Sequence, residues 1–166
     1  MNFPTGVTKI LGKPVKSVDA RPFLEELCQT AFSGYTVESL FGMGGVEESA
    51  LVFRSGKVVG SVYEYHSSHQ TLSGDESIPH VLNAFLSESG ILDVVELSNQ
   101  QVDLVLAFTA VLRLAKPLDK TSFRSLFPSA YNPRLGETIS SHAQQSVFST
   151  KESLFKRFGL NGIEGK

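Results

Sequence analysis

The stretch that decides the fold is Glu48-Ser-Ala-Leu-Val-Phe-Arg54, then Ser55-Gly56, then Lys57-Val-Val-Gly-Ser-Val-Tyr-Glu-Tyr-His66. Two runs rich in β-branched and aromatic residues flank a two-residue turn, a pattern typical of a β-hairpin. Gly60 lies inside the second run and has no side chain, which predicts that another element packs closely on its face. The hairpin is therefore the element from which the rest of the fold is argued.

Residues on both sides extend this hairpin into an α+β pattern. Tyr35–Phe41 alternates polar and apolar residues, which predicts a strand before the hairpin, and Ile91–Leu97 predicts a fourth strand after it. A first helix is expected from Pro22 to Phe32, because proline is tolerated in the first turn. A second helix follows Asp75, where apolar residues recur at helical spacing. We expect an antiparallel sheet of about four strands with helices packed on one face.

A third helix is predicted beyond the capping-box pattern Ser98-Asn-Gln-Gln101. Residues Val102–Ala115 are apolar on nearly all sides, so this helix is buried or covers the sheet and also meets a partner. The run contains Asp103 and Arg113 and is too short to span a bilayer, so no membrane span is expected. We place a protein-interaction surface on this helix and on the hairpin, at Tyr63, Tyr65, Val102, Val105, Phe108 and Leu112.

The sequence pattern divides the chain into a domain over residues 1–116 and a C-terminal arm over 117–166. A short strand is expected near Val15–Val18 in the lead-in to the first helix. The arm is richer in serine and threonine, and its aromatic residues have no clear period. A short basic amphipathic helix is predicted near residues 151–158, and at about two turns it needs packing to be stable.

Charge is distributed unevenly along the 166 residues, although the formal net charge is only −2. Residues 1–21 carry +3, residues 22–115 carry −9, and residues 116–166 carry +4. The basic flanks either dock on the acidic body or help to steer a partner. An acidic body without a recognised nucleic-acid-binding motif argues against a nucleic-acid partner.

The single cysteine, Cys28, lies among apolar residues at helical spacing and is interpreted as a small core residue. One cysteine cannot form an intramolecular disulfide, and no CxxC pair is present. The N-terminal residues lack the apolar run of a signal peptide. Together these features favour a reducing, cytoplasmic setting.

Two histidines three residues apart, His66 and His69, are the weak candidates for a metal site. A zinc site needs three or four ligands, and His80 with Asp75 could supply the others if the fold brings them close. The alternative is a pair of solvated histidines in a loop. A metal-binding or small-ligand sensor is therefore the second hypothesis, and no resident cofactor is expected.

Catalytic motifs are missing from the sequence. Gly42-Met-Gly-Gly45 resembles a phosphate loop, but two acidic residues and a predicted strand follow it where a phosphate loop requires a helix. Neither a Gly-x-Ser-x-Gly elbow nor a HExxH helix occurs. We therefore expect a protein that is not an enzyme, with an enzyme of unrecognised type as the third hypothesis.

Several motifs in order resemble an archaeal family catalogued as domain of unknown function 2226. The resemblance covers roughly residues 13–116 and the tail. The motifs that carry it include Leu24-Glu-Glu-Leu27, Phe32-Ser-Gly-Tyr35, Phe53-Arg-Ser-Gly-Lys-Val-Val-Gly60, Val81-Leu-Asn-Ala-Phe85, Glu96-Leu-Ser-Asn-Gln-Gln-Val-Asp-Leu-Val-Leu-Ala-Phe108 and Leu154-Phe-Lys-Arg-Phe-Gly-Leu160.

A looser resemblance is to the PATAN-type adaptor domain of bacterial signalling proteins. It implies an interaction module whose partner is a signalling protein or a small GTPase, and it supplies no catalytic residue. The leading hypothesis is therefore a non-catalytic, cytoplasmic adaptor or regulatory module, with a homodimer as one assembly that its apolar helix could form.

Overall fold

The computed structural model describes residues 3–42 and 45–136, and the chain divides into two compact units, residues 1–133 and 134–166. The fold described here is that of the first unit. Its strands are β1 (Val7–Pro14), β2 (Gly34–Gly42), β3 (Gly45–Arg54), β4 (Lys57–Tyr65), β5 (Gln70–Ser73), β6 (Ile91–Glu96) and β7 (Arg113–Leu118). Its helices are α1 (Ala20–Gln29), α2 (Ile78–Ala84), α3 (Asn99–Phe108) and α4 (Lys120–Leu126).

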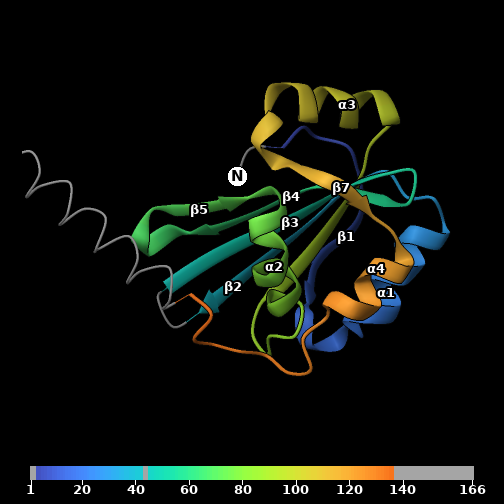
Figure 1. Cartoon of the computed structure of the whole chain (residues 1–166). Helices are drawn as coiled ribbons and strands as arrows, with labels where there is room; N and C mark the ends of the chain where they lie inside the picture. The colour runs from blue at the N-terminus through green and yellow to red at the C-terminus, as the bar shows by residue number, and fades with distance from the viewer. Residues whose placement is uncertain (1–2, 43–44, 137–166) are drawn as a thin grey trace, which may run out of the picture. The chain divides into compact units, whose positions relative to one another are not determined.

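These elements form the expected α+β fold, but the antiparallel sheet has seven strands rather than about four (Figure 1). The strand order is β1-β6-β2-β3-β4-β5, and β7 also pairs with β4. All four expected strands are present as β2, β3, β4 and β6. The strands beyond the prediction are β1 and β5, at the ends of this order, and β7, which shares the edge of β4 with β5.

The hairpin of β3 and β4 has the turn that its sequence predicts. Ser55 and Gly56 have φ angles of 49° and 75°, and Arg54 pairs with Lys57 directly before and after them. Two positive φ angles in a two-residue loop are the signature of a type I′ turn, whose twist matches that of the strands. The Gly56 N–H also donates to the Phe32 carbonyl at 2.8 Å, which ties the turn to the segment between α1 and β2.

Helices lie on both faces of the sheet, which corrects the expectation of a single covered face (Figure 1). The His80 ring of α2 contacts the rings of Tyr63 and Tyr65 in β4. A Cβ placed on Gly60 would lie 3.1 Å from a methyl carbon of Leu106 in α3. Side chains alternate along a strand, so residue 60 and residues 63 and 65 face opposite sides. The α3 helix therefore packs against the face opposite to α2.

Two expected elements have different boundaries. The segment Val15–Ser17 is a 3₁₀ turn, and the strand that precedes α1 lies before it, at β1. The helix expected over Val102–Ala115 ends at Phe108, and the chain then forms a 3₁₀ turn and β7. The helix ends because Thr109 leaves helical geometry, with φ −126° and ψ 61°, while its hydroxyl donates to the Val105 carbonyl. Leu114 is consequently a buried strand residue.

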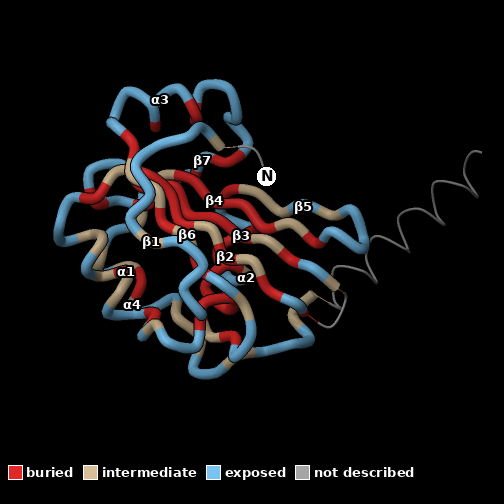
Figure 2. Tube along the Cα trace, turned by 180° about the vertical axis from the view of Figure 1, so that it is seen from behind, coloured by how far each residue is buried: buried red, intermediate tan, exposed pale blue. Residues whose placement is uncertain are grey.

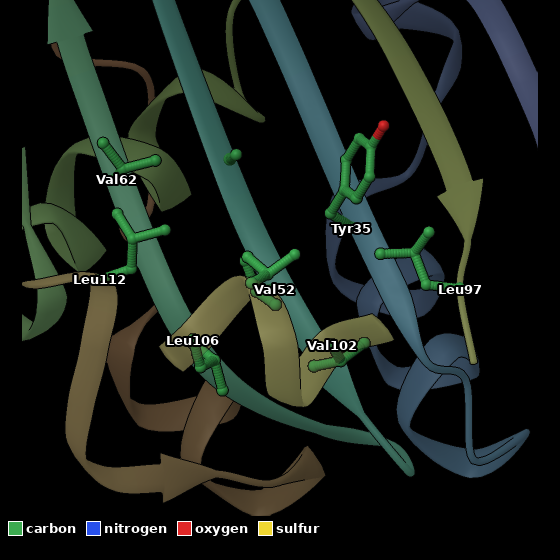
Figure 3. Packing of buried hydrophobic residues seen from close by; sticks show 9 residues of the cluster. Tyr35, Val52, Val62, Leu97, Val102, Leu106 and Leu112 are labelled. Carbon is green, nitrogen blue, oxygen red and sulfur yellow. The ribbon is translucent and has the colours of Figure 1, made fainter. Parts of the chain in front are cut away.

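The central strands hold the core, and β1 is exposed along most of its length (Figure 2). On one face, residues of β2, β3 and β4 pack against α3 and the turn after it (Figure 3). The buried members of this cluster are Tyr35, Ala50, Val52, Val62, Leu97, Val102, Val105, Leu106 and Leu112. The α3 helix is thus fixed on the sheet by its inward residues.

The domain boundary expected after residue 116 falls inside β7, and the first compact unit extends to Pro133. The backbone N–H of Asn132 donates to the side-chain oxygen of Asn83 in α2 at 2.7 Å. The helix expected near residues 151–158 lies outside the described residues. Among the residues that are described, no helix has both the length and the apolar character needed to cross a membrane.

Candidate functional site

The outer face of α3 is the first candidate site, because large apolar side chains are exposed on it and next to it. Phe108 is 85% exposed, Leu104 is 56% exposed, and Val111 in the turn after the helix is 73% exposed. Ser98 and Gln101 form the capping box that starts this helix, and the opposite side of the helix is buried against the sheet. Apolar residues on both sides of one helix indicate a surface that has a further contact to make.

A pocket of about 310 Å³ lies against this face. Its floor and walls are mostly apolar, and Tyr35 fixes one wall by donating from its hydroxyl to the Pro4 carbonyl at 2.9 Å. The Phe3 ring stacks on Tyr35 with centroids 4.7 Å apart, which holds the same N-terminal segment in place. The lining residues are Pro4, Gln101, Leu104, Val105, Phe108 and Thr109.

Charged groups next to α3 are satisfied within the chain. The Arg54 guanidinium donates two hydrogen bonds to the Asp103 carboxylate, at 2.7 and 3.0 Å, and this bonding lowers the pKa of Asp103. The Arg113 side chain donates to the Leu106 carbonyl at 3.1 Å. The apolar surface is therefore bordered by charges that already have partners, which lowers the electrostatic cost of covering it.

Of the six residues predicted as an interaction surface, Phe108 is exposed and the other five are buried. Val102, Val105 and Leu112 face the sheet, and Tyr63 and Tyr65 lie beneath α2 on the opposite face. Four of these side chains cannot contact a partner directly in this structure, whereas Val105 is reachable only through the pocket that it lines. Sequence reasoning found the helix but missed Leu104 and Val111, because a run that is apolar on all sides does not indicate which side faces the sheet.

Buried polar pairs on the α2 face of the sheet are the second candidate site. The Tyr63 hydroxyl donates to the Glu47 carboxylate at 2.5 Å, and the Tyr65 hydroxyl lies 2.6 Å from Nδ1 of His80. Burial raises the pKa of Glu47, Tyr63 and Tyr65 and lowers the pKa of His80, because each charged form loses hydration. Glu38 in the same layer is fully buried, and burial raises its pKa to about 8.

Burial favours the uncharged form of each of these groups, and the hydroxyl groups of Tyr63 and Tyr65 are hydrogen-bonded under α2. Such pairs can hold or exchange a proton, but they lie beneath packed helices, and they also specify the register of β2, β3 and β4. The alternation of polar and apolar residues in β2 does not indicate that Glu38 faces the interior, because a glutamate between apolar residues is usually on the solvated face.

The histidines predicted as metal ligands are not brought together. His80 is on α2 and bonds to Tyr65, whereas His69 is an exposed residue at the end of a 3₁₀ turn. Asp75 accepts a hydrogen bond from the Ala115 N–H at 3.0 Å. His66 instead lies beside two acidic residues of the hairpin, with Nε2 3.1 Å from Glu48 and 3.9 Å from Glu64.

Cys28 is half-buried on α1, and burial raises the pKa of its thiol to about 11. A thiol with this pKa is almost entirely protonated near neutral pH, so it is a poor nucleophile. Cys28 is therefore only partly enclosed and is not the core residue that its sequence pattern predicted.

Comparisons with known proteins give one family. No curated protein and no solved structure matches the chain. The model of a family described as "Uncharacterized protein conserved in archaea (DUF2226)" matches residues 1–109. This match spans β1 through α3 and so includes the hairpin and the exposed helix face, whereas the PATAN resemblance rests on sequence motifs alone. The chain therefore belongs to the DUF2226 family of uncharacterized proteins conserved in archaea.

Proposed function

We propose that this protein is a non-catalytic interaction module that associates through the outer face of α3, and that its first partner there is a second copy of the chain. The observation that carries the proposal is the group of Leu104, Phe108 and Val111, all more than half exposed beside an apolar pocket. Soluble monomers rarely leave large contiguous apolar areas exposed, and areas of this kind are typical of contact sites.

The surface is suited to pairing with itself, because it offers both a projecting group and a cavity. Phe108 projects from the end of α3 and also borders the pocket of about 310 Å³. In a twofold dimer the same patch is used by both copies, so each Phe108 ring would enter the pocket of the other copy. Asp103 is already bonded to Arg54, so antiparallel α3 helices would not bring unpaired like charges together.

In an adaptor role, a protein different from this chain would also bind the outer face of α3. The partner class that we expect, a signalling protein or a small GTPase, comes from the sequence resemblance and would compete for the same face of α3. An enzymatic role has less support, because the hydrogen-bonded Tyr63–Glu47 and Tyr65–His80 pairs lie beneath α2.

The test compares two exposed phenylalanines. Phe108 is in the proposed contact, and Phe41, 73% exposed, lies near the C-terminal end of β2, outside both the pocket and the cluster beneath α3. We expect sedimentation equilibrium in the micromolar range to give a dimer for the wild type and for Phe41→Ser. Phe108→Ser should weaken the dimer at least about tenfold, since buried aromatic anchors dominate such contacts.

Circular dichroism would establish that both variants are folded. A wild type that is monomeric at every concentration tested would contradict the proposed self-association. Equal dissociation of Phe41→Ser and Phe108→Ser would show that the effect does not depend on α3, and would contradict it as well.

A further inference from the structure

We propose that Glu48, Glu64 and His66 form a binding site for one divalent transition-metal ion, specifically Zn²⁺. Each of the three side chains offers one ligand atom, and these atoms all lie within 4.8 Å of one another. The site is separate from the α3 contact and does not depend on the proposed association.

The β-ladder places the three residues on one patch of the sheet. Glu48 in β3 and Glu64 in β4 are direct partners in the antiparallel pairing. His66 follows Glu64 by two residues, and side chains two apart on a strand point to the same face. The two carboxylates therefore come from paired strands, and the imidazole comes from the first residue after β4.

The distances between the ligand atoms suit a shared metal ion. His66 Nε2 lies 3.1 Å from a Glu48 carboxylate oxygen and 3.9 Å from a Glu64 carboxylate oxygen. Ligands about 2.1 Å from a zinc ion with tetrahedral angles lie about 3.4 Å from one another. The two separations of His66 bracket this value, and all three ligand atoms lie within 4.8 Å of one another, so rotation of the side chains can bring them around one ion.

Electrostatics favours a divalent ion at this patch. Glu48 and Glu64 are direct partners on neighbouring strands, and like charges in such positions are destabilising. A divalent ion attracts both carboxylates and accepts the imidazole of His66 as a third ligand.

The donor set also selects among metal ions. One imidazole nitrogen with two carboxylate oxygens suits zinc better than magnesium, which prefers oxygen ligands and retains its water. The side chains of Glu48, Glu64 and His66 are all partly exposed, so an ion can reach them from solvent. Three protein ligands leave a fourth position for water or for a group from a partner.

The experiment is a calorimetric titration of tag-free, metal-stripped full-length chain with ZnCl₂, and separately with MgCl₂. We expect one Zn²⁺ per chain and no magnesium binding under the same conditions. His66→Gln and Glu64→Gln should each weaken zinc binding at least about tenfold. Loss of a group that only supports a metal ligand already costs about 10–100-fold, and these variants remove a ligand itself. The matched control is His69→Gln, a second exposed histidine three residues away that is outside the cluster.

Thermal unfolding with and without Zn²⁺ provides a second measurement, because an ion that binds only the folded chain raises the unfolding temperature. This rise should occur in the wild type and in His69→Gln and be lost in His66→Gln. The proposal is overturned if the wild type binds no stoichiometric zinc. It is equally overturned if His66→Gln and Glu64→Gln both retain wild-type affinity, or if His69→Gln loses binding to the same extent.

Discussion

Glu38 of β2 and Ser49 of β3 lie directly opposite each other, and the Ser49 hydroxyl donates a hydrogen bond to the Glu38 carboxyl in the interior of the sheet. Glu38 is fully buried, and the loss of hydration raises its pKa to about 8. At neutral pH the folded chain therefore holds this carboxyl mostly in its protonated, uncharged form.

The first prediction is that Glu38 makes the folded state less stable as the pH rises. The ordinary pKa is 4.5, so between about pH 5 and 8 the unfolded chain releases this proton while the folded chain keeps it. The free energy of unfolding should fall by up to about 1.4 kcal/mol per pH unit in this window. Glu38→Gln keeps a similar shape without the titration, so its stability should depend less on pH.

Urea unfolding at several pH values between 5 and 8 measures this difference. Glu26→Gln is the control, because Glu26 is exposed on α1 and its variant should keep the wild-type pH profile. Parallel pH profiles for the wild type and Glu38→Gln would contradict the raised pKa of Glu38.

The second prediction concerns the reactivity of Cys28. Burial raises the pKa of its thiol from 9.0 to about 11, and the thiolate is the reactive form. At pH 8 the native chain should therefore react with iodoacetamide about a hundredfold more slowly than the chain unfolded in urea. Mass spectrometry of timed samples gives both rates. Native labelling within a few-fold of the unfolded rate would show that Cys28 is accessible and ionised.

Local signals were sufficient for part of the fold. The Ser55-Gly56 turn predicts the hairpin, and the capping box at Ser98 predicts the start of α3. The strands β1 and β7 gave no such signal. The β1 strand is exposed at nearly every position, so it has no apolar alternation, and β7 contains Pro117, which argues against a strand.

The candidate metal site could not be predicted from the sequence, because the pairing of Glu48 with Glu64 depends on the register between β3 and β4. Counting outward from the turn, where Arg54 pairs with Lys57, would place Glu48 opposite Tyr63. The ladder instead pairs Phe53 with Val58 and Val52 with Gly60, so it skips one residue of β4. This irregularity shifts every later pair by one residue, and Glu48 meets Glu64. The position of a bulge depends on tertiary packing, which no local pattern encodes.

The third prediction tests the close approach of α3 to the sheet at Gly60. A Cβ at this position would lie 3.1 Å from a Leu106 methyl carbon and 3.2 Å from the Leu112 carbonyl oxygen. Gly60→Val should lower the free energy of unfolding by about 1–3 kcal/mol, because it overpacks the cluster beneath α3. Chemical denaturation measures this loss.

The Gly60→Val, Leu106→Ala double variant distinguishes crowding from a backbone effect. If the new side chain collides with Leu106, the double variant should be more stable than the sum of the two single losses implies. Strictly additive losses would show that the cost does not arise from contact with Leu106 and would leave the Leu112 carbonyl and the strand backbone as its sources.

The fourth prediction concerns the turn that sets the hairpin. Gly56 has a φ of 75°, and a Cβ added there would lie 2.2 Å from the Cys28 carbonyl oxygen. Gly56→Ala should therefore cost about 2–3 kcal/mol, from the strained left-handed conformation and from displacement of the end of α1. Ser55→Gly is the matched control, because Ser55 also has a positive φ and glycine adopts it without strain. Its change in stability should stay below about 1 kcal/mol by chemical denaturation. Similar losses for both variants would mean that contact with α1 does not determine the choice of glycine at position 56.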